Sequence, residues 1–346
     1  MTNPLQSDLD HILAHTNGLW DELRGKRIFI TGGTGFFGCW LLESFVRAND
    51  EFGLKAEVVV LTRDPEAFDR KVPHLARHPA VWCHKGDVRD FQFPEGQFSH
   101  VIHAAAEADT TLNKADPLKT WDTIVKGTQR TVEFTNHAKA SAILLVSSGA
   151  VYGPQPEAVA RIAEDYGGAP NPLVPASAYG EGKRAAELWA VAGSARSACE
   201  VKIARGFAFL GPYLPLNGSF AAGNFVRDAL GGGPVIVMGD GTAVRSYLYG
   251  ADLAIWLWTI LIRGRTGRAY NVGGEHEVSM VELAKVVAQE HGKSCSIKIM
   301  MEPIPGKPVV RYVPDTQRAR DELGLTQHIA LEEAIRKMFK SYAKYK

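Results

Sequence analysis

The stretch Arg27-Ile28-Phe29-Ile30-Thr31-Gly32-Gly33-Thr34-Gly35-Phe36-Phe37-Gly38 decides how this chain folds. Its first half is a short apolar run typical of a buried strand, and apolar residues with helical spacing follow from Trp40. Three spaced glycines fit the junction: one allows a tight turn, one lets the backbone approach a pyrophosphate, and one lets helix and strand pack closely. The amide groups at the helix N-terminus then face the phosphates.

A tight strand-to-helix turn without any ligand is the simpler alternative for this stretch. The strand before the glycines and the helix after them favour the dinucleotide-binding interpretation instead. The predicted contacts from this stretch are Gly32, Gly35, Phe36, Phe37 and Gly38.

Composition is typical of a globular enzyme. The chain has 346 residues, of which 45% are hydrophobic and 22% charged, with a formal net charge of +1. This balance favours neither a nucleic-acid nor a membrane-surface partner. Four scattered cysteines lack metal-ligand spacing, so we expect reduced thiols, no metal site and a cytoplasmic protein. The longest apolar run, 251–262, is too short to span a bilayer, and no signal peptide is indicated.

A second strand is predicted over 57–61, and the residues at its end bear on the cofactor. An acidic residue at this point would accept hydrogen bonds from the adenosine ribose. Here the chain has Thr62 and Arg63, and a guanidinium with a hydroxyl suits a 2′-phosphate better. This pair favours NADP over NAD. Asp64 could still take the acidic role if the turn is offset by two residues.

Two further strand ends are predicted to line the cofactor. After the strand within 82–88, Asp87 is placed for the adenine amino group and Val88 offers a backbone N–H. The strand that begins at 100 ends in small residues, which leave room for a flat ligand beyond the sheet edge. The contacts expected there are Ala104, Ala105 and Ala106. His103 could be a general base, but a packed strand histidine is favoured.

The predicted catalytic group follows the fifth strand, 143–146. Tyr179 and Lys183 are four residues apart on a predicted helix, so they share one face about 5–6 Å apart at Cβ. A free phenol has a pKa of about 10, and a neighbouring ammonium together with an oxidised nicotinamide would lower it. Tyr179 could then exchange a proton with a substrate oxygen that Ser148, at a strand end, also contacts. The alternative for such a pair is a solvated helix face.

At this point the sequence resembles an extended short-chain dehydrogenase/reductase of the nucleotide-sugar epimerase/dehydratase family. The resemblance runs from about Lys26 to Leu325. Besides the glycine turn, Ser148 and Tyr179/Lys183, its motifs are Gly86-Asp87-Val88, His103-Ala104-Ala105, Val151-Tyr152-Gly153, Gly211-Pro212, Gly239-Asp240-Gly241, Arg245 and Tyr270-Asn271-Val272-Gly273.

The resemblance implies an α/β architecture: a Rossmann, doubly wound parallel sheet with a smaller C-terminal α/β substrate-binding domain. The expected division is 1–204 for the NAD(P)-binding domain and 205–346 for the mostly substrate-binding part, with segments that return to the first domain. Residues 1–24 are expected to form a helical extension on the first domain, or else a dimer contact. Relatives pair through two helices, so 117–138 and 179–194 are expected to form a homodimer interface.

A nucleoside-diphosphate sugar is the substrate class that the resemblance implies. Guanidinium groups suit a diphosphate because they bind it bidentately. Arg245 and Arg311 are therefore predicted to bind the phosphates, although a surface ion pair is the alternative for each. Asn224 lies in a segment that resembles the family's nucleotide-base contact. The predicted substrate contacts are Ser148, Gly149, Ala150, Asn224, Arg245 and Arg311.

The chain departs from the family pattern directly after Ser148. The 4,6-dehydratases carry an Asp-Glu pair there, which eliminates water across C5 and C6, and UDP-glucuronate decarboxylases keep a glutamate. This chain has Gly149 and Ala150, and neither side chain can transfer a proton. Both reactions therefore become less favoured. Ala208 and Ile124 also replace asparagines that are common in relatives, which affects the expected substrate pose.

The remaining chemistry is hydride transfer at C4 of the sugar. We expect a 4-keto-sugar reductase, because Thr62 and Arg63 favour NADPH, with a 4-epimerase as the alternative. A non-catalytic, nucleotide-sensing relative is a third possibility, which retention of Ser148, Tyr179 and Lys183 disfavours. The sequence identifies neither the nucleotide base nor the sugar.

Overall fold

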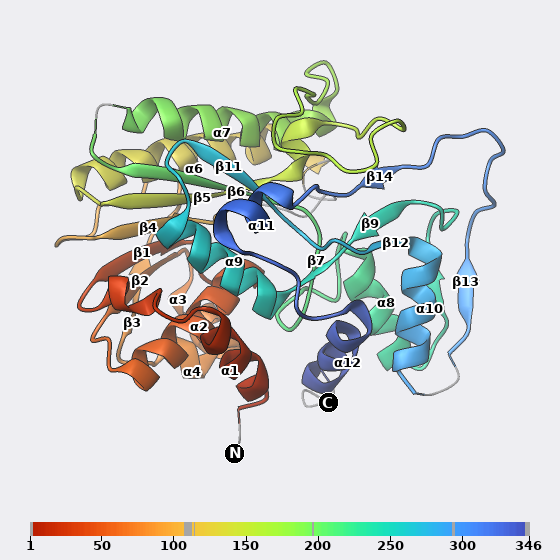
Figure 1. Ribbon diagram of the computed structural model, residues 1–346, viewed down its shortest axis with the longest axis horizontal. Helices are drawn as coiled ribbons and strands as arrows, with labels where there is room; N and C mark the ends of the chain where they lie inside the picture. The colour runs from red at the N-terminus through yellow and green to blue at the C-terminus, as the bar shows by residue number, and fades with distance from the viewer. Residues whose placement is uncertain (1–2, 107–112, 114, 196, 293–294, 343–346) are drawn as a thin grey trace.

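A seven-stranded parallel sheet forms the centre of the molecule in a computed structural model, which describes residues 3–106, 113, 115–195, 197–292 and 295–342 (Figure 1). The strand order is β11-β6-β5-β4-β1-β2-β3, so the chain reverses direction across the sheet between β1 and β4. In open parallel sheets, ligands bind beyond the strand ends at such a reversal. The strands are β1 Arg27–Thr31, β2 Glu57–Thr62, β3 Val81–Lys85, β4 His100–His103, β5 Ala142–Ser148, β6 Glu200–Gly206 and β11 Arg268–Val272.

Helices cover both faces of this sheet, as expected for a doubly wound fold. One face packs against α6 (Pro117–His137) and α7 (Ala178–Ser194), and the other against α2 (Phe36–Phe52) and α9 (Gly250–Arg263). Side chains of a strand alternate between the two faces. Accordingly, Ile28 and Ile30 belong to the core on the α2 side, whereas Phe29 belongs to the core on the α6 side.

The N-terminal segment packs against the α2 face. Its helix α1 (Gln6–His15) contacts α2 and α9, and a short 3₁₀ helix, η1 (Trp20–Leu23), precedes β1. Between β2 and β3 lie the short helices α3 (Pro65–Lys71) and α4 (Pro73–Ala76).

The two long helices predicted over 117–138 and 179–194 correspond to α6 and α7. Each forms within one residue of its predicted bounds.

Smaller sheets stand beside the carboxyl ends of the main strands, toward the right of Figure 1. They are β7 with β10, β9 between β12 and β14, and β8 with β13. Their strands are β7 Phe209–Leu210, β8 Val235–Val237, β9 Val244–Ser246, β10 Leu248–Tyr249, β12 Glu277–Ser279, β13 Ile297–Ile299 and β14 Arg311–Tyr312. The accompanying helices are α8 Ala221–Leu230, α10 Met280–Glu290, α11 Gln317–Leu323 and α12 Leu331–Tyr342.

The predicted Rossmann architecture is confirmed by the parallel sheet and its flanking helices. Two elements from the C-terminal part of the sequence, α9 and β11, belong to the main sheet and its cover. The helix α9 is buried almost all round, which explains its continuous apolar sequence. None of the described helices is both long enough and apolar enough to cross a membrane.

Candidate active site

The glycine turn lies where β1 and β4 diverge. Gly32 has a φ of 72°, and a Cβ there would lie 2.6 Å from the backbone carbonyl of Ala104. A Cβ on Gly38 would lie 2.3 Å from the Gly33 backbone, so α2 can start this close to β1 only with glycine at 38. Two of the three predicted glycine roles, the tight turn at Gly32 and the close helix–strand packing at Gly38, are therefore visible in the structure.

The first turn of α2 presents amide groups that suit a dinucleotide. Gly35 is the N-cap residue and supplies no side-chain hydrogen bond, so the first amides of the helix keep no partner within it. A cation also reaches this loop, because Lys71 Nζ donates to the Thr34 carbonyl at 2.7 Å. Unpaired amides and a nearby ammonium fit a pyrophosphate. The sequence argument missed Lys71, since nothing local connects it with the turn.

The residues predicted for the ribose lie at the end of β2. Thr62 is buried, and its hydroxyl accepts a hydrogen bond from the Asp64 amide. Asp64 is the N-cap of α3, where its carboxylate accepts from Ala67 N at 2.9 Å. This bond uses the carboxylate that the alternative interpretation assigned to the ribose. Arg63 is exposed and makes no hydrogen bond within the described part of the chain.

Asp87, the predicted adenine contact, is held by a neighbour. Arg89 forms a two-pronged ion pair with it, with nitrogen–oxygen distances of 2.8 and 2.9 Å. This hydrogen bonding, together with the charge of Arg63, lowers the pKa of the Asp87 carboxyl. Val88 is half-buried and packs against Gly127.

His103 is a packed histidine, as favoured from the sequence. Its ring lies between three threonine hydroxyls, with Thr31 at 2.7 Å, Thr128 at 3.0 Å and Thr131 at 3.3 Å. Burial, helped by the charge of Lys183, lowers the pKa of His103 to about 3. It is therefore neutral near pH 7 and orders the strand end before Ala104.

Ser148, Tyr179 and Lys183 come together at the carboxyl end of β5. Ser148 is the last residue of β5, and its hydroxyl lies close enough to the Tyr179 phenol to lower the pKa of that phenol. Lys183 lies one turn further along α7, with Nζ 5.9 Å from the Tyr179 ring centroid and 2.8 Å from the Val146 carbonyl that it donates to. The predicted catalytic residues thus lie together, with Ser148 and Lys183 buried and Tyr179 half-buried.

The expected electrostatics of this group need a correction. Burial raises the pKa of Tyr179, and the Ser148 hydrogen bond lowers it only in part. Burial also lowers the pKa of Lys183 to about 8, while the charge of Glu187 raises it. In the protein alone, desolvation is the largest influence on both groups, so Tyr179 is not made acidic there.

The position after Ser148 is closed by an aromatic ring. A Cβ on Gly149 would lie 2.6 Å from Phe207 Cζ, so the ring tip takes the space of any side chain at 149. Phe207 directly follows β6 and is buried, with 9% of its surface exposed. An acid at this position would need Phe207 to move. The sequence argument noted the glycine but could not identify its neighbour.

Tyr312 is a site residue that the sequence argument missed. It belongs to β14 and packs on Phe207, with 4.6 Å between ring centroids and the ring planes tilted by 34°, and its hydroxyl lies 3.4 Å from Ser148 Oγ. Burial raises the pKa of Tyr312 far above its usual value, so it is a neutral phenol. A tyrosine in a two-residue strand gives no local signal. Of the two residues in this strand, only Arg311 was predicted from the sequence to bind the substrate.

The two predicted phosphate-binding arginines have different surroundings. Arg245 lies beside the site, 5.7 Å from the Tyr312 ring centroid, and donates to the backbone carbonyls of Val244 and Val310. Arg311 instead forms an ion pair with Glu277 at 2.5 Å. The structure therefore gives Arg311 the surface ion pair that was its alternative role, and leaves Arg245 next to the catalytic group.

The other predicted substrate contacts lie at two places. Asn224 is on α8, where its side chain donates to the Gly218 carbonyl and accepts from Arg227. Ala150 is half-buried beside Ser148, and its amide donates to the Ser148 hydroxyl at 3.1 Å. Ala208 packs at the edge of the main core, and Ile124 is buried against Gly182 next to Lys183.

A buried ion pair holds α7, the helix that carries Tyr179 and Lys183, against the sheet. Glu187, one turn after Lys183, accepts two hydrogen bonds from Arg205 at 2.9 and 2.6 Å and one from Ser147 at 2.5 Å. Arg205 also donates to the Tyr152 hydroxyl at 2.8 Å. Because β5, β6 and α7 each contribute one of these groups, the network fixes the helix on the sheet.

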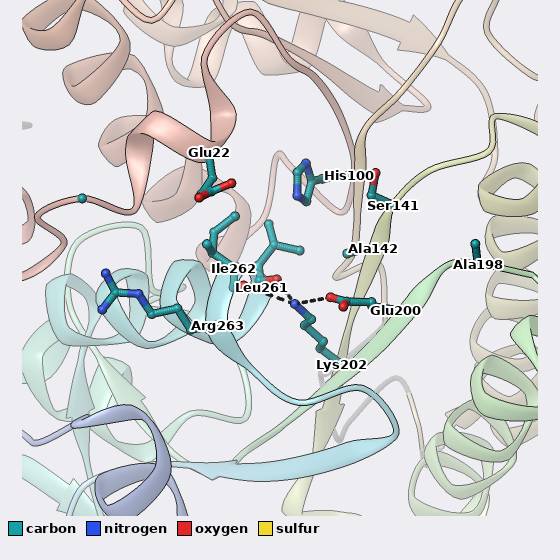
Figure 2. Close-up of a pocket in the computed structure, with 11 residues that line it drawn as sticks. Glu22, His100, Ser141, Ala142, Ala198, Glu200, Lys202, Leu261, Ile262 and Arg263 are labelled. Atoms are coloured by element: carbon teal, nitrogen blue, oxygen red, sulfur yellow. Dashed lines mark hydrogen bonds and ion pairs between the residues drawn. The ribbon is translucent and has the colours of Figure 1, made fainter.

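A separate cavity of about 560 Å³ lies at the opposite edge of the sheet, among the first residues of β4, β5 and β6 (Figure 2). Its central cation, Lys202, pairs with Glu200 at 2.9 Å and donates to the Leu261 carbonyl at 2.8 Å, near the end of α9. Burial and nearby lysines lower the pKa of His100 in its wall to about 4. Lys202 thus satisfies helix carbonyls and is far from the catalytic group.

Comparison with known proteins identifies the family. The model of the NAD dependent epimerase/dehydratase family matches residues 28–273. The chain belongs to this family. The predicted family is therefore confirmed, and the glycine turn, Ser148, Tyr179 and Lys183 all lie within the match.

Similar curated proteins are UDP-glucuronic acid decarboxylases. Decarboxylase 3 from Arabidopsis thaliana is 32% identical over 314 residues, which is 89% of this chain and 86% of that protein. Decarboxylase 1 from Xenopus tropicalis is 30% identical over 319 residues, 92% of this chain and 72% of that protein. These enzymes act on nucleotide sugars, so the comparison supports an enzyme of that broad class.

Similar solved structures include a dehydratase. DesIV, the dTDP-glucose 4,6-dehydratase from Streptomyces venezuelae, was solved with NAD bound, is 26% identical and has a TM-score of 0.78. The alignment covers 92% of this chain and 97% of DesIV. MoeE5, solved with UDP-glucuronic acid and NAD, is 25% identical, with a TM-score of 0.76 and coverage of 92% and 100%.

Proposed function

We propose that this protein is an NAD(P)-dependent oxidoreductase that acts at C4 of a nucleoside-diphosphate sugar, as a 4-keto-sugar reductase. One observation carries the proposal. The hydroxyls of Ser148 and Tyr179 meet beside Lys183, while the next position, Gly149, is filled by the Phe207 ring. The site therefore holds groups for proton exchange at a carbinol, but no acid after Ser148.

Tyr179, Ser148 and Lys183 each have a separate role in the proposed reaction. The nicotinamide, when bound, supplies the hydride that C4 gains as its carbonyl bond is reduced. Tyr179 delivers the proton to O4, because it is a neutral phenol when its pKa is raised. Ser148 donates a hydrogen bond to the same oxygen and orients it. Lys183, held by the Val146 carbonyl, provides the positive charge that stabilises the tyrosinate left behind.

Two other reactions of relatives are disfavoured by the residues after Ser148. The names of the similar curated proteins indicate decarboxylation, and that of DesIV indicates dehydration. Both would need an acid or base near Gly149 in the resemblance drawn above. Gly149 and Ala150 cannot transfer protons, and the Phe207 ring leaves no space for another side chain at 149.

A 4-epimerase is the second candidate, and one observation favours it. The relatives DesIV and MoeE5 were solved with NAD, and an epimerase, which keeps its cofactor, usually resembles NAD-binding relatives. The same three residues, Ser148, Tyr179 and Lys183, would then oxidise C4 and reduce it from the other face.

Cofactor turnover distinguishes the two candidates. The purified protein is incubated with dTDP-4-keto-6-deoxyglucose and with UDP-glucose, in the presence of NADPH or NADH. We expect one NADPH oxidised for each ketone reduced. Interconversion of UDP-glucose and UDP-galactose without net cofactor change would identify an epimerase. Failure to convert any nucleotide sugar, with binding retained, would support the nucleotide-sensing alternative instead.

We also propose NADP as the preferred cofactor, although the solved relatives named above hold NAD. The support is local: Arg63 is exposed at the end of β2, Asp64 is used as a helix cap, and Lys71 lies at the glycine loop. Exchange of Arg63 for alanine should weaken NADPH at least about tenfold and leave NADH nearly unchanged. Equal loss with both cofactors would contradict this assignment.

The substrate-binding residues are proposed on their position. Arg245 lies next to Tyr312 and is suited to the sugar diphosphate, with Ser148, Gly149 and Ala150 around the sugar. Asn224 is proposed for the nucleotide base. Arg311 keeps a phosphate role only if the substrate displaces Glu277.

We propose a homodimer through α6 and α7. Both helices carry large apolar side chains exposed to solvent, including Leu118 at 78% and Leu188 at 71%. Trp121, Trp189 and Val191 extend this surface, which would be covered in a dimer. Replacement of Leu188 by aspartate should convert a dimer to a monomer in light-scattering chromatography.

The cytoplasm is the compartment that we propose, because all four cysteines are free thiols.

A further inference from the structure

We infer that Tyr312 is a positioning residue for the proposed reaction: its hydroxyl donates a hydrogen bond to Ser148 Oγ and so directs the Ser148 proton toward the substrate oxygen. This inference rests on the proposed function, in which Ser148 donates to that oxygen. It gives a role to a phenol of the smaller sheets that the proposed reaction does not otherwise use.

The first step is the hydrogen-bonding capacity of Ser148. A serine hydroxyl has one proton to donate and two lone pairs that accept. The Ala150 amide donates to Ser148 Oγ at 3.1 Å and uses one lone pair. The Tyr312 hydroxyl, 3.4 Å away, is placed to use the other. Tyr179 also lies close, but its proton goes to the substrate oxygen in the proposed reaction.

The second step is the proton of Tyr312. Burial raises the pKa of this phenol, so it stays a neutral donor. Two acceptors lie 3.4 Å from its oxygen, Ser148 Oγ and the Gly206 carbonyl. These distances are long for O–H···O hydrogen bonds, and bonds of this kind in catalytic groups shorten when substrate binds.

The two acceptors have different consequences for Ser148. If Tyr312 donates to Ser148, both lone pairs of the serine are occupied, and its own proton is left for the substrate oxygen. If Tyr312 donates only to Gly206, its oxygen can accept the serine proton and draw it away from the substrate. We propose the first arrangement, and the two differ in whether Tyr312 acts through Ser148.

The third step is how Tyr312 is held. Its ring packs on Phe207, with 4.6 Å between ring centroids. The next residue, Val313, donates its amide to Gln155 Oε1 at 2.9 Å and accepts from the Ile162 amide at 3.0 Å. None of these contacts involves the Tyr312 hydroxyl. Tyr312→Phe therefore removes the hydroxyl and leaves the ring and backbone contacts in place.

The strand pair that carries Tyr312 also carries the proposed phosphate contact. β14 pairs in parallel with β9, and Tyr312 lies opposite Arg245 in that register. The Tyr312 hydroxyl meets the last residues of β5 and β6, Ser148 and Gly206. The smaller sheets therefore reach the catalytic group through this phenol.

The experiment is a double-mutant cycle on the full chain. Steady-state kcat and KM are measured for Tyr312→Phe, Ser148→Ala and the double variant, with dTDP-4-keto-6-deoxyglucose and NADPH, or with UDP-glucose if the protein is an epimerase. Tyr312→Phe is also combined with Ser148→Thr, which keeps a hydroxyl at 148. Tyr166→Phe is the matched control, because Tyr166 is a half-buried phenol in the same aromatic cluster and packs on Tyr152.

We expect Tyr312→Phe to lower kcat about three- to tenfold, the range of one lost hydrogen bond, with KM for the nucleotide sugar within about twofold. The same loss should appear with Ser148→Thr. It should fall below about twofold with Ser148→Ala, because no serine hydroxyl is then left to orient. Tyr166→Phe should leave kcat and KM unchanged.

Three results would overturn the inference and leave the proposed function intact: an unchanged kcat for Tyr312→Phe, a higher KM at the same kcat, or an equal loss with and without the Ser148 hydroxyl. Conversion of no nucleotide sugar by the unchanged protein would overturn the proposed function and, with it, the inference.

Discussion

The two walls that we propose for the candidate site, one for the cofactor and one for the substrate, are built in different ways. The cofactor wall consists of the segments 31–38, 62–63, 87–88 and 103–106, each directly after a strand of the main sheet or close to its end. The substrate wall consists of Gly149, Phe207, Arg245 and Tyr312, which come from four distant places in the sequence. The cofactor wall follows from parallel strand order alone, whereas the substrate wall depends on how the smaller sheets pack.

The largest effect is expected where the two walls meet, at Tyr179. Tyr179→Phe removes the proton donor and should reduce kcat at least about a thousandfold, with cofactor affinity unchanged. Steady-state turnover and cofactor titration measure the two quantities. Tyr166→Phe is the matched control, since Tyr166 packs on Tyr152 outside the catalytic group. A loss of less than tenfold for Tyr179→Phe would contradict its role.

The cofactor wall is tested next by two glycines of the same turn. Gly38→Ala places a Cβ 2.3 Å from the Gly33 backbone and should lower the free energy of unfolding by about 2–3 kcal/mol. Gly35→Ala meets its nearest atom only at 3.4 Å, so stability should change little while cofactor binding weakens. Chemical denaturation and cofactor titration separate these effects. Equal stability of the two variants would show that the turn can relax.

The substrate wall is tested by restoring a side chain after Ser148. Gly149→Ala collides with the Phe207 ring tip and should destabilise the protein by about 1–3 kcal/mol. In the double variant with Phe207→Leu, the smaller side chain removes the collision, so part of the stability should return. The coupling energy from the four denaturation curves decides this. Additive effects would mean that the ring is not what restricts position 149.

A smaller contrast is expected between the two arginines. Arg245→Ala should raise KM for the nucleotide sugar by about ten- to a hundredfold, because a bidentate phosphate contact is lost. Arg311→Ala breaks the partly exposed ion pair with Glu277 and should change stability by no more than about 1 kcal/mol. Similar increases in KM for the two variants would indicate that Arg311 also binds the substrate. Initial-rate kinetics at saturating cofactor provide the measurement.

The smallest predicted effect concerns pH. Lys183 has a pKa lowered to about 8 by burial, so its charge is lost as the pH rises through 8, and the rate should fall there. Glu187 raises this pKa, so Glu187→Gln should move the fall to lower pH by up to about one pH unit. Glu181→Gln is the control, because Glu181 pairs with Arg184 on the same helix. An unmoved pH profile would exclude Lys183 as the titrating group.

The local geometry of the proposed cofactor wall is easier to predict from the sequence than that of the proposed substrate wall, for a physical reason. Gly32, Gly38 and His103 act on neighbours within the strand ends that carry them, so spacing and residue type were sufficient. Tyr312 reaches Ser148 only because β14 pairs with β9, a contact that depends on tertiary packing. The raised pKa of Tyr179 was also missed, since burial is invisible in a motif. The Glu277 partner of Arg311 was hidden for the same reason.

The late position of β11 constrains how the chain can fold during synthesis. β6 pairs with β5 on one side and β11 on the other, but β11 follows only after β7 to β10, α8 and α9 have been made. Until then the open edge of β6 exposes unpaired backbone groups of the kind that recruit other chains. The ribosome must therefore release β7 to β10, four strands of the smaller sheets, before the large sheet can close, and chaperone protection is most useful in that interval.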